Sequence, residues 1–144
     1  MPGCHTPGVD DAVARFRAAS ETNDIESLVA ALAPDAELVS PLSRRMVFRG
    51  REDLRVLFAA IYGSLREVHW YDEVGDGRIR VVLGRAFVGP LRLDDAMVVE
   101  LDDDGCIQCI RPHLRPWLAM TAFALQLGPK LVRDFGVVRR ALRA

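Results

Sequence analysis

Two aspartates are the residues of this sequence best suited to proton transfer, which requires an ionisable group whose pKa lies near the working pH. Asp95 lies in a segment where apolar residues recur at every second position, and residues two apart on a strand point to the same face. The residues that would share its face are Leu93, Met97 and Val99. Among such neighbours a carboxyl loses hydration and its pKa rises, which makes Asp95 a candidate general acid or base. Asp72 is the second candidate, because strand alternation places it on the same face as Trp70.

A surface location is the other interpretation of Asp95, and the sequence alone favours it. Arg92 precedes Asp94 and Asp95 closely enough to pair with both at the end of a strand. An acid held there would face water and take no part in chemistry. If Asp95 or Asp72 does act as a base, Tyr62 or Trp70 could donate a hydrogen bond to the reacting molecule.

Ser40, His69 and Asp72 have the residue types of a hydrolytic triad. However, the G-x-S-x-G turn that exposes a nucleophilic serine is absent. His69 and Trp70 are neighbours on a predicted strand and therefore point to opposite faces. We interpret the trio as coincidence and expect His69 at the surface or in an interface.

The cysteines indicate neither a metal nor a redox site. Cys106 and Cys109 form the pattern C-x-x-C, but residues three apart on a strand point to opposite faces and do not readily form a bridge. No second cysteine pair and no H-x3-H follows, so a zinc site would be incomplete. We expect both to be small buried hydrophobic residues. Including Cys4, the cysteines are too few for a secreted disulfide scaffold, which predicts a cytoplasmic protein.

Charge and hydropathy exclude several classes of partner. Nineteen basic and twenty acidic residues give a net charge of −1, so the basic surplus on which nucleic-acid binding relies is missing. The longest apolar run, 117–127, is about half as long as a membrane span. Residues 1–8 lack the cationic start and apolar centre of a secretory signal. The D-D-D-G sequence at 102–105 is a hairpin turn without the spacing of a calcium loop, and we expect no metal ion and no cofactor.

A chain of 144 residues and 16.0 kDa, half of it apolar, has the size and composition of one globular domain. No internal repeat or linker divides it. We therefore expect a single domain over 1–144, with a core of about 9–115 and a C-terminal extension of about 116–142.

The first half of the sequence predicts three helices and two short strands. Apolar residues at three- and four-residue spacing indicate a helix from Val9 to Ala19, and a second helix from Ile25 until Pro34 stops it. Short strands are expected at 36–40 and 46–48. A third helix follows, and one apolar face predicts that it lies on a sheet. That face consists of Leu54, Leu57, Phe58, Ile61 and Leu65.

From residue 66 onward, turn residues separate long alternating segments, which predicts four antiparallel strands in a meander. The second of these, 79–88, is apolar on both faces. Helices would cover one face, and a second subunit is the simplest cover for the other. We expect a homodimer packed through the convex side of the sheet, including Cys109, Arg111 and His113.

Pro116 begins a final helical segment, which Gly128–Pro129 is expected to divide into an apolar half and a basic half. Residues 117–127 are too few to span a membrane and too apolar to remain in water, so they must be covered. We expect residues 116–142 to pack over the mouth of a cavity or over its rim, with the chain bending at Gly128–Pro129. The side chains expected to dock the basic half on the domain are Leu131, Phe135, Val138 and Leu142.

The order of helix, short helix, strand, helix and then a curved meander resembles the cone-shaped fold of the nuclear transport factor 2 (NTF2) superfamily. Three segments resemble the corresponding segments of ketosteroid isomerases and SnoaL-like polyketide cyclases: NDIESLVAALAPDAELVSP (23–41), FRGREDL (48–54) and LDDDGCIQ (101–108). The resemblance runs from about Val13 to Leu114. It implies an α+β, cystatin-like cone in which a curved antiparallel sheet wraps the N-terminal helices and an extra C-terminal helix follows. One fold hosts many activities, so the resemblance does not define a reaction.

The resemblance also implies that the catalytic residues of these enzymes are missing. The position of the isomerase general base is Ser40, that of its oxyanion-binding tyrosine is Phe16, and that of its protonated acid is Met97. The aspartate on the last strand of the cyclases and of limonene epoxide hydrolases corresponds to Pro112. A hydroxyl is no general base near neutral pH unless another base lies beside it. This chain is therefore not expected to perform the known reactions with the known residues.

Three functions remain open at this point. The first is binding of an apolar or polycyclic small molecule in the cone. The residues expected to line it are Phe16, Ser40, Tyr62, Trp70, Met97, Ile110, Pro112 and Leu114. The second is an isomerase or cyclase that uses Asp95 or Asp72 without a metal. The third is a non-catalytic, dimeric interaction module whose cone is filled by its own side chains.

Overall fold

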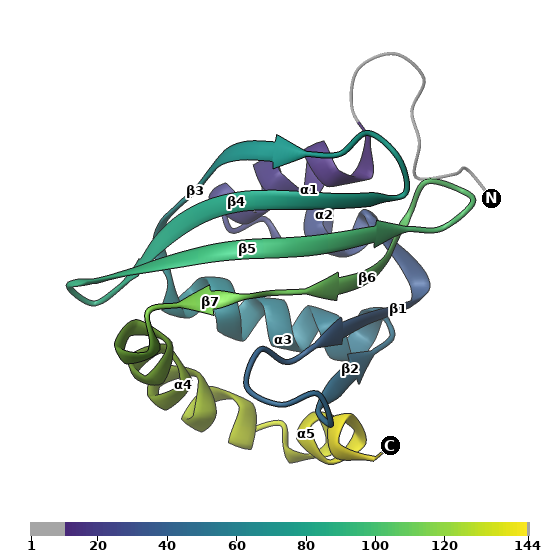
Figure 1. Ribbon diagram of the computed structural model, residues 1–144. Coiled ribbons are helices and arrows are strands. Elements are labelled where there is room, and N and C mark those ends of the chain that lie inside the picture. Colours follow the sequence, from purple (N-terminus) through teal and green to yellow (C-terminus); the bar gives the residue numbers. More distant parts are fainter. Residues whose placement is uncertain (1–10, 144) are drawn as a thin grey trace.

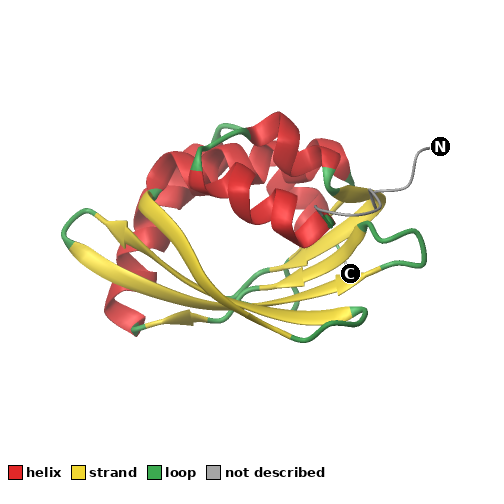
Figure 2. Ribbon diagram, turned by 90° about the horizontal axis from the view of Figure 1, so that it is seen from above, coloured by secondary structure: helices red, strands yellow, loops and turns green. Residues whose placement is uncertain are grey.

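A curved, seven-stranded sheet carries helices on its concave face (Figure 2). The computed structural model describes residues 11–143 (Figure 1). Its helices are α1 (Ala12–Glu21), α2 (Ile25–Ala30), α3 (Arg51–Ser64), α4 (Trp117–Val132) and α5 (Phe135–Leu142). Its strands are β1 (Leu32–Val39), β2 (Val47–Arg49), β3 (Arg66–Val74), β4 (Ile79–Val88), β5 (Leu91–Leu101), β6 (Ile107–Arg111) and β7 (Leu114–Arg115). The predicted α+β class is confirmed.

Aspartate side chains cap both N-terminal helices. Asp11 accepts a hydrogen bond from the Ala14 backbone N–H at 2.8 Å, and Asp24 caps α2 in the same way. The helix expected to run until Pro34 ends earlier, because Leu32 already pairs with β6. Pro34 lies where the pairing between β1 and β6 shifts register, at a point where a missing N–H is tolerated. Val9 and Cys4, which also entered the predictions, lie outside the described residues.

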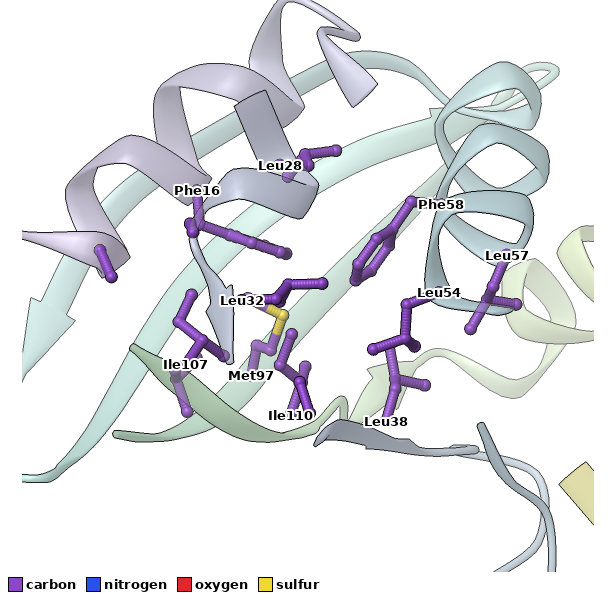
Figure 3. Close-up of a cluster of buried hydrophobic side chains, with 14 of the residues drawn as sticks. Phe16, Leu28, Leu32, Leu38, Leu54, Leu57, Phe58, Met97, Ile107 and Ile110 are labelled. Atoms are coloured by element: carbon purple, nitrogen blue, oxygen red, sulfur yellow. The ribbon is translucent and has the colours of Figure 1, made fainter. Parts of the chain in front are cut away.

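Packing between α1, α3 and the sheet forms the main core. The third helix presents Leu54, Leu57 and Phe58 to the interior, as its spacing predicts. Figure 3 shows the rings of Phe16 and Phe58 pointing toward each other, and their centroids are 5.6 Å apart in an edge-to-face arrangement. This core occupies much of the space that the curved sheet encloses.

The sheet order is β2-β1-β6-β5-β4-β3, and β7 pairs with β5. The predicted meander from β3 to β6 is antiparallel throughout. The expectation of a wholly antiparallel sheet is wrong at one place, because β1 pairs with β6 in parallel. A parallel pair needs a long crossover, and here α3 and the meander provide it.

The two faces of β4 differ in burial, although both are apolar in sequence. The concave face, which includes Val82 and Val88, is buried, whereas Leu83 and Phe87 on the convex face are half-buried. Ion pairs also lie on the convex side, between Arg111 and Glu100 and between Arg92 and Asp94. The expected homodimer through this face stays a prediction.

The two cysteines near the last turn differ. Cys106 is buried and disulfide-bonded, so it is not simply the small hydrophobic residue that we expected. Cys109 is half-buried and free, so the C-x-x-C pair does not form a bridge, as strand alternation predicts. Disulfides persist mainly in oxidising compartments. The cysteines therefore no longer support the predicted cytoplasmic location.

The C-terminal extension forms two helices, but the break between them is not at Gly128–Pro129. Helix α4 continues through Pro129, and the chain turns at Arg133 and Asp134 instead. A proline there removes only the bond to the Leu125 carbonyl, on a turn of the helix that faces water.

Helix α5 docks mainly through Val137 and Ala141, and Arg140 forms two hydrogen bonds of 2.8 and 2.9 Å to Asp53. Leu131 is buried and Val138 packs against the core, as expected. Phe135 and Leu142 are exposed, so the expected docking face is wrong for these two.

Candidate functional site

Two adjoining apolar hollows lie between α3, the sheet and the C-terminal helices. The first, here called the inner cavity, has a volume of about 70 Å³ and is lined by α3, α4 and the strands β3, β4 and β5. The second, the outer cavity, has a volume of about 240 Å³ and lies between α3, α4, α5 and the β1–β2 loop. The residues that line both are Leu38, Pro41, Ile61, Leu114 and Phe123. The two hollows therefore adjoin each other across these shared side chains, and together they are called the cleft. Helix α4 contributes side chains to both, so part of the segment 116–142 borders the cleft, and its role as a cover over the mouth stays a prediction.

A hydrogen-bonded network fixes the aromatic wall of the inner cavity. The Trp70 indole Nε1 donates to the Ser20 hydroxyl at 2.7 Å, and that hydroxyl donates to the Arg17 carbonyl at 2.9 Å. Ser20 also hydrogen-bonds with Tyr62. Ser20 is 2% exposed, so these bonds form in a dry environment, where they hold the two aromatic residues in place.

Gly84 allows Trp70 to lie flat against the sheet. The two residues are cross-strand partners in β3 and β4. A Cβ atom at Gly84 would lie 2.4 Å from the indole ring, closer than any real contact permits. Among the residues that line the inner cavity, Gly84 has a role that the sequence analysis missed, and an isolated glycine inside an apolar strand was the available signal.

Asp95 contributes a carboxyl group to the lining of the inner cavity, and it is the cross-strand partner of Gly84 in the sheet. Burial raises its pKa from 3.8 to about 7, although a hydrogen bond from the His113 backbone N–H, 3.2 Å from Oδ1, acts to lower it. Tyr62 lies nearby: burial, together with the charge of Asp95, raises the pKa of its hydroxyl. Near neutral pH, Asp95 can therefore both hold and release a proton.

The favoured surface interpretation is correct for Asp94 and wrong for Asp95. Arg92 Nε lies 3.0 Å from Asp94 Oδ1, on the outward face of β5. Asp95 follows Asp94 directly and therefore points to the other face, toward the cavity.

Asp72 is not brought to the cleft. A register shift between Trp70 and Asp72 interrupts the two-residue alternation on which its predicted orientation depends. Its side chain is exposed, and Oδ1 accepts a hydrogen bond of 2.8 Å from the next backbone N–H, that of Glu73. The Ser40, His69 and Asp72 trio is not assembled either, because β1 and β3 are separated by three other strands.

Most of the side chains expected to line the cone do so. Tyr62, Trp70, Met97 and Pro112 line the inner cavity, Ser40 lines the outer cavity, and Leu114 lines both. Phe16 and Ile110 are corrections, because they are buried in the core and face neither cavity. Which side chains of α4 line the cleft was not predicted from the sequence. They are Met120, Phe123, Ala124, Leu127, Leu131 and Val132.

Within residues 11–143, no group of histidine, cysteine and acidic side chains is arranged to hold a metal ion. The polar side chains that line the cleft include Asp95, Tyr62 and Arg85 at the inner cavity and Ser40 at the outer cavity. No helix in this part of the chain is long and apolar enough to cross a membrane.

Solved structures with the same architecture identify the fold. An uncharacterised bacterial protein with a cystatin-like fold from Silicibacter pomeroyi superposes with a TM-score of 0.85 at 20% identity, over 94% of this chain and 96% of that one. A steroid delta-isomerase from Pseudomonas aeruginosa gives 0.77 at 22% identity, over 92% and 99% of the two chains. An NTF2-like protein of unknown function from Cytophaga hutchinsonii gives 0.66 at 12% identity, over 81% and 99%.

No protein-family profile matches the sequence, and no curated protein matches it. At such identities the structural similarity establishes the fold alone. The NTF2-like, cystatin-like fold that the sequence segments predict is confirmed.

Proposed function

We propose that this chain binds a compact, largely apolar small molecule in the cleft formed by the inner and outer cavities, with Asp95 as its polar anchor. The observation that carries the proposal is a raised-pKa carboxyl at the inner end of an otherwise apolar cleft. Such a site would bind the apolar body of a ligand and orient one carbonyl or hydroxyl group toward Asp95 and Tyr62.

The volumes of about 70 and 240 Å³, taken together, lie only at the lower end of the range of about 300–1,000 Å³ for drug-sized ligands, which favours a compact ligand over a polycyclic one. Phe16, Phe58 and Trp70 fill part of the space that a multi-ring molecule would need. A non-catalytic interaction module would be favoured if the chain's own side chains filled the outer cavity. They leave it open, and ligand binding is therefore the better supported function.

Proton transfer by an isomerase or cyclase is the second candidate function, and the position of Asp95 favours it. A carboxylate with a pKa of about 7 can take a proton from a carbon next to a ligand carbonyl and return it to another carbon. The Tyr62 hydroxyl could hydrogen-bond the carbonyl oxygen meanwhile. One structural neighbour is a steroid delta-isomerase, whereas the sequence resemblance to ketosteroid isomerases implies that Ser40 stands at the position of their general base. Ketosteroid isomerisation is therefore not expected, and Ser40→Asp alone should not create it.

Binding is tested with an apolar fluorescent dye and a series of small cyclic ketones as competitors. Ala124→Phe, which fills the outer cavity, should weaken dye binding about tenfold or more. Thr121→Phe is the matched control, since Thr121 lies one turn earlier on the exposed face of the same helix. Equal binding by both variants, or no binding by the unmodified chain, would reject the cleft as a ligand site.

Catalysis is tested separately, by hydrogen–deuterium exchange at the carbon next to the carbonyl of a bound ketone. Exchange should rise with pH around a midpoint near 7 and disappear in Asp95→Asn, while dye binding persists. Exchange that survives in Asp95→Asn would remove the enzymatic candidate and leave the binding proposal intact.

A second copy of the chain is our proposal for what covers the convex face. Support comes from the half-buried apolar residues of β4 and β5 on that side, together with Cys109, Arg111 and His113. The His113 ring is anchored there by a 3.1 Å hydrogen bond between Nδ1 and the Ala96 carbonyl oxygen. The absence of a nucleic-acid partner and the cytoplasmic location stay predictions.

A further inference from the structure

The outward face of α4 is apolar and uncovered. Ala119, Phe123 and Leu131 pack against the domain, and residues on the opposite side of the helix recur every three or four positions. The exposed apolar side chains are Trp117 (72% exposed), Leu118 (53%), Leu125 (73%) and Val132 (67%). No charged residue occurs from 117 to 129. A surface stripe of this kind needs a partner.

The stripe continues beyond the end of α4. Phe135 at the start of α5 is 64% exposed, and Leu42 in the β1–β2 loop is 58% exposed. Leu42 and Val132 line the outer cavity together, so the loop and the end of α4 are neighbours (Figure 1). The mouth of that cavity therefore opens onto the same apolar surface.

Unpaired positive charge gathers in the same segments. Eight arginines of the described chain form ion pairs, and others bond to backbone carbonyls or lie over a ring. The exposed arginines without any side-chain partner among residues 11–143 are Arg44, Arg45, Arg115, Arg133, Arg139 and Arg143. All of them lie in the β1–β2 loop or in the C-terminal segment 115–143. Asp134 is the single acid of that segment.

A second copy of the chain fits this surface poorly. Two-fold pairing of α4 with itself would bring the Arg115 end of one helix against the Arg133 end of the other, and like charges repel. A layer of anionic lipids fits both features, since apolar side chains enter the boundary of the acyl chains while arginines meet phosphates. Tryptophan is favoured at that depth.

We infer that the surface formed by α4, α5 and the β1–β2 loop docks on a bilayer that contains anionic lipids. Helix α4 lies in the plane of the interface, with Trp117, Leu125 and Val132 in the acyl boundary and the unpaired arginines beside the headgroups. The mouth of the outer cavity then faces the lipid. This inference does not depend on what the cleft binds.

The full chain is tested by co-sedimentation with vesicles of phosphatidylcholine alone and of phosphatidylcholine with phosphatidylserine. Binding should be about tenfold or more stronger to the anionic vesicles and should weaken as salt is added. Trp117 fluorescence should shift to the blue on binding, because Trp117 leaves water while Trp70 is already buried. Trp117→Phe should remove that shift.

Surface variants distinguish docking through this face from non-specific adsorption of exposed apolar side chains to the vesicles. Combined Leu118→Ser, Leu125→Ser and Val132→Ser should reduce vesicle affinity about tenfold or more. The matched control is Val74→Ser with Ile79→Ser, whose side chains are equally exposed (58% and 57%) on β3 and β4. Arg133→Glu with Arg139→Glu should abolish the preference for anionic lipid, whereas Arg78→Glu in the β3–β4 turn should not. Circular dichroism confirms that each variant is folded.

Three outcomes would overturn the inference. One is the absence of sedimentation with phosphatidylserine vesicles, and another is equal sedimentation of the triple serine variant. The third is a dimer, detected by light scattering, that the triple serine variant dissociates in the absence of lipid. That result would assign the stripe to a second copy of the chain.

Discussion

At the scale of single residues, opposing effects on Asp95 decide what the cleft can do. Burial raises the pKa of this carboxyl to about 7, and the hydrogen bond from His113 N–H opposes the rise without cancelling it. The carboxyl is thus stabilised in its protonated form when the chain folds. Its pKa has a consequence for stability that can be measured without knowing any ligand.

Asp95 should make folding stability fall as pH rises from about 4 to about 7. The folded pKa lies above the unfolded value of 3.8, so the folded state binds more protons in that window. The loss is on the order of 4 kcal/mol and is complete above the folded pKa. Asp95→Asn, which still accepts the His113 N–H, should not show this decline and should be the more stable protein at pH 8. Thermal melting from pH 4 to 8 tests this, and parallel curves for the two proteins would contradict it.

Alternation along strands predicted the neighbours of Asp95 but not its location. Leu93 and Met97 do share its face. Arg92 forms its ion pair with Asp94 and not with Asp95, and the spacing of these residues in the sequence does not decide between the two acids. Asp72 shows the reverse case, because a bulge in β3 reverses its side chain and no local sequence signal marks it. Interactions between distant segments, such as Trp70 with Gly84 and Ser20, were also beyond pattern analysis.

At the scale of elements, most helices and strands could be predicted because their periodicity follows from burial. The exceptions are places where tertiary contact outweighs local preference. Pairing with β6 recruits Leu32 into β1, and packing of α4 carries that helix through Pro129. The covering role of 116–142 followed from hydropathy alone, since so apolar a segment must be buried on one side. It is buried on one side only, and periodicity does not show which face stays in water.

Truncation after Arg115 should expose the cleft and destabilise the domain. The truncation removes the buried side chains of Phe123, Leu131 and Val137, and it leaves the core residues that they contact exposed to water. Each large side chain contributes about 1.5–3 kcal/mol, so the loss should amount to several kcal/mol. The melting temperature should fall and binding of an apolar dye should increase. Arg140→Ala is the control, because the Arg140 side chain in its pair with Asp53 is exposed, and ion pairs of exposed side chains add little to stability. An unchanged melting temperature in the truncated protein would make the segment a dispensable tail.

At the scale of the whole molecule, the sheet separates two surfaces with different requirements. The concave side is covered by this chain's own helices (Figure 2), and most of the residues that line the cleft lie on those helices and on the sheet. Among residues 11–143, no segment covers Leu83, Phe87 and Val98 on the convex side, and these side chains stay half-buried between ion pairs. The outward face of α4 and the convex face of the sheet are therefore both apolar surfaces without a partner. The arginines beside α4 are unpaired, whereas the charged side chains on the convex face already form ion pairs.

A surface whose charges are already paired suits association with an identical surface, because no charge must lose its partner. We expect a homodimer through the convex face, with Val98 near its centre, since Val98 pairs with Val81 on one side and Arg111 on the other. Val98→Arg should place unpaired charge there and convert the dimer to a monomer, as measured by light scattering at micromolar concentration. Leu125→Arg on α4 should leave the dimer intact. A monomeric unmodified chain, or a dimer broken by Leu125→Arg and not by Val98→Arg, would show that the convex face is not the subunit interface.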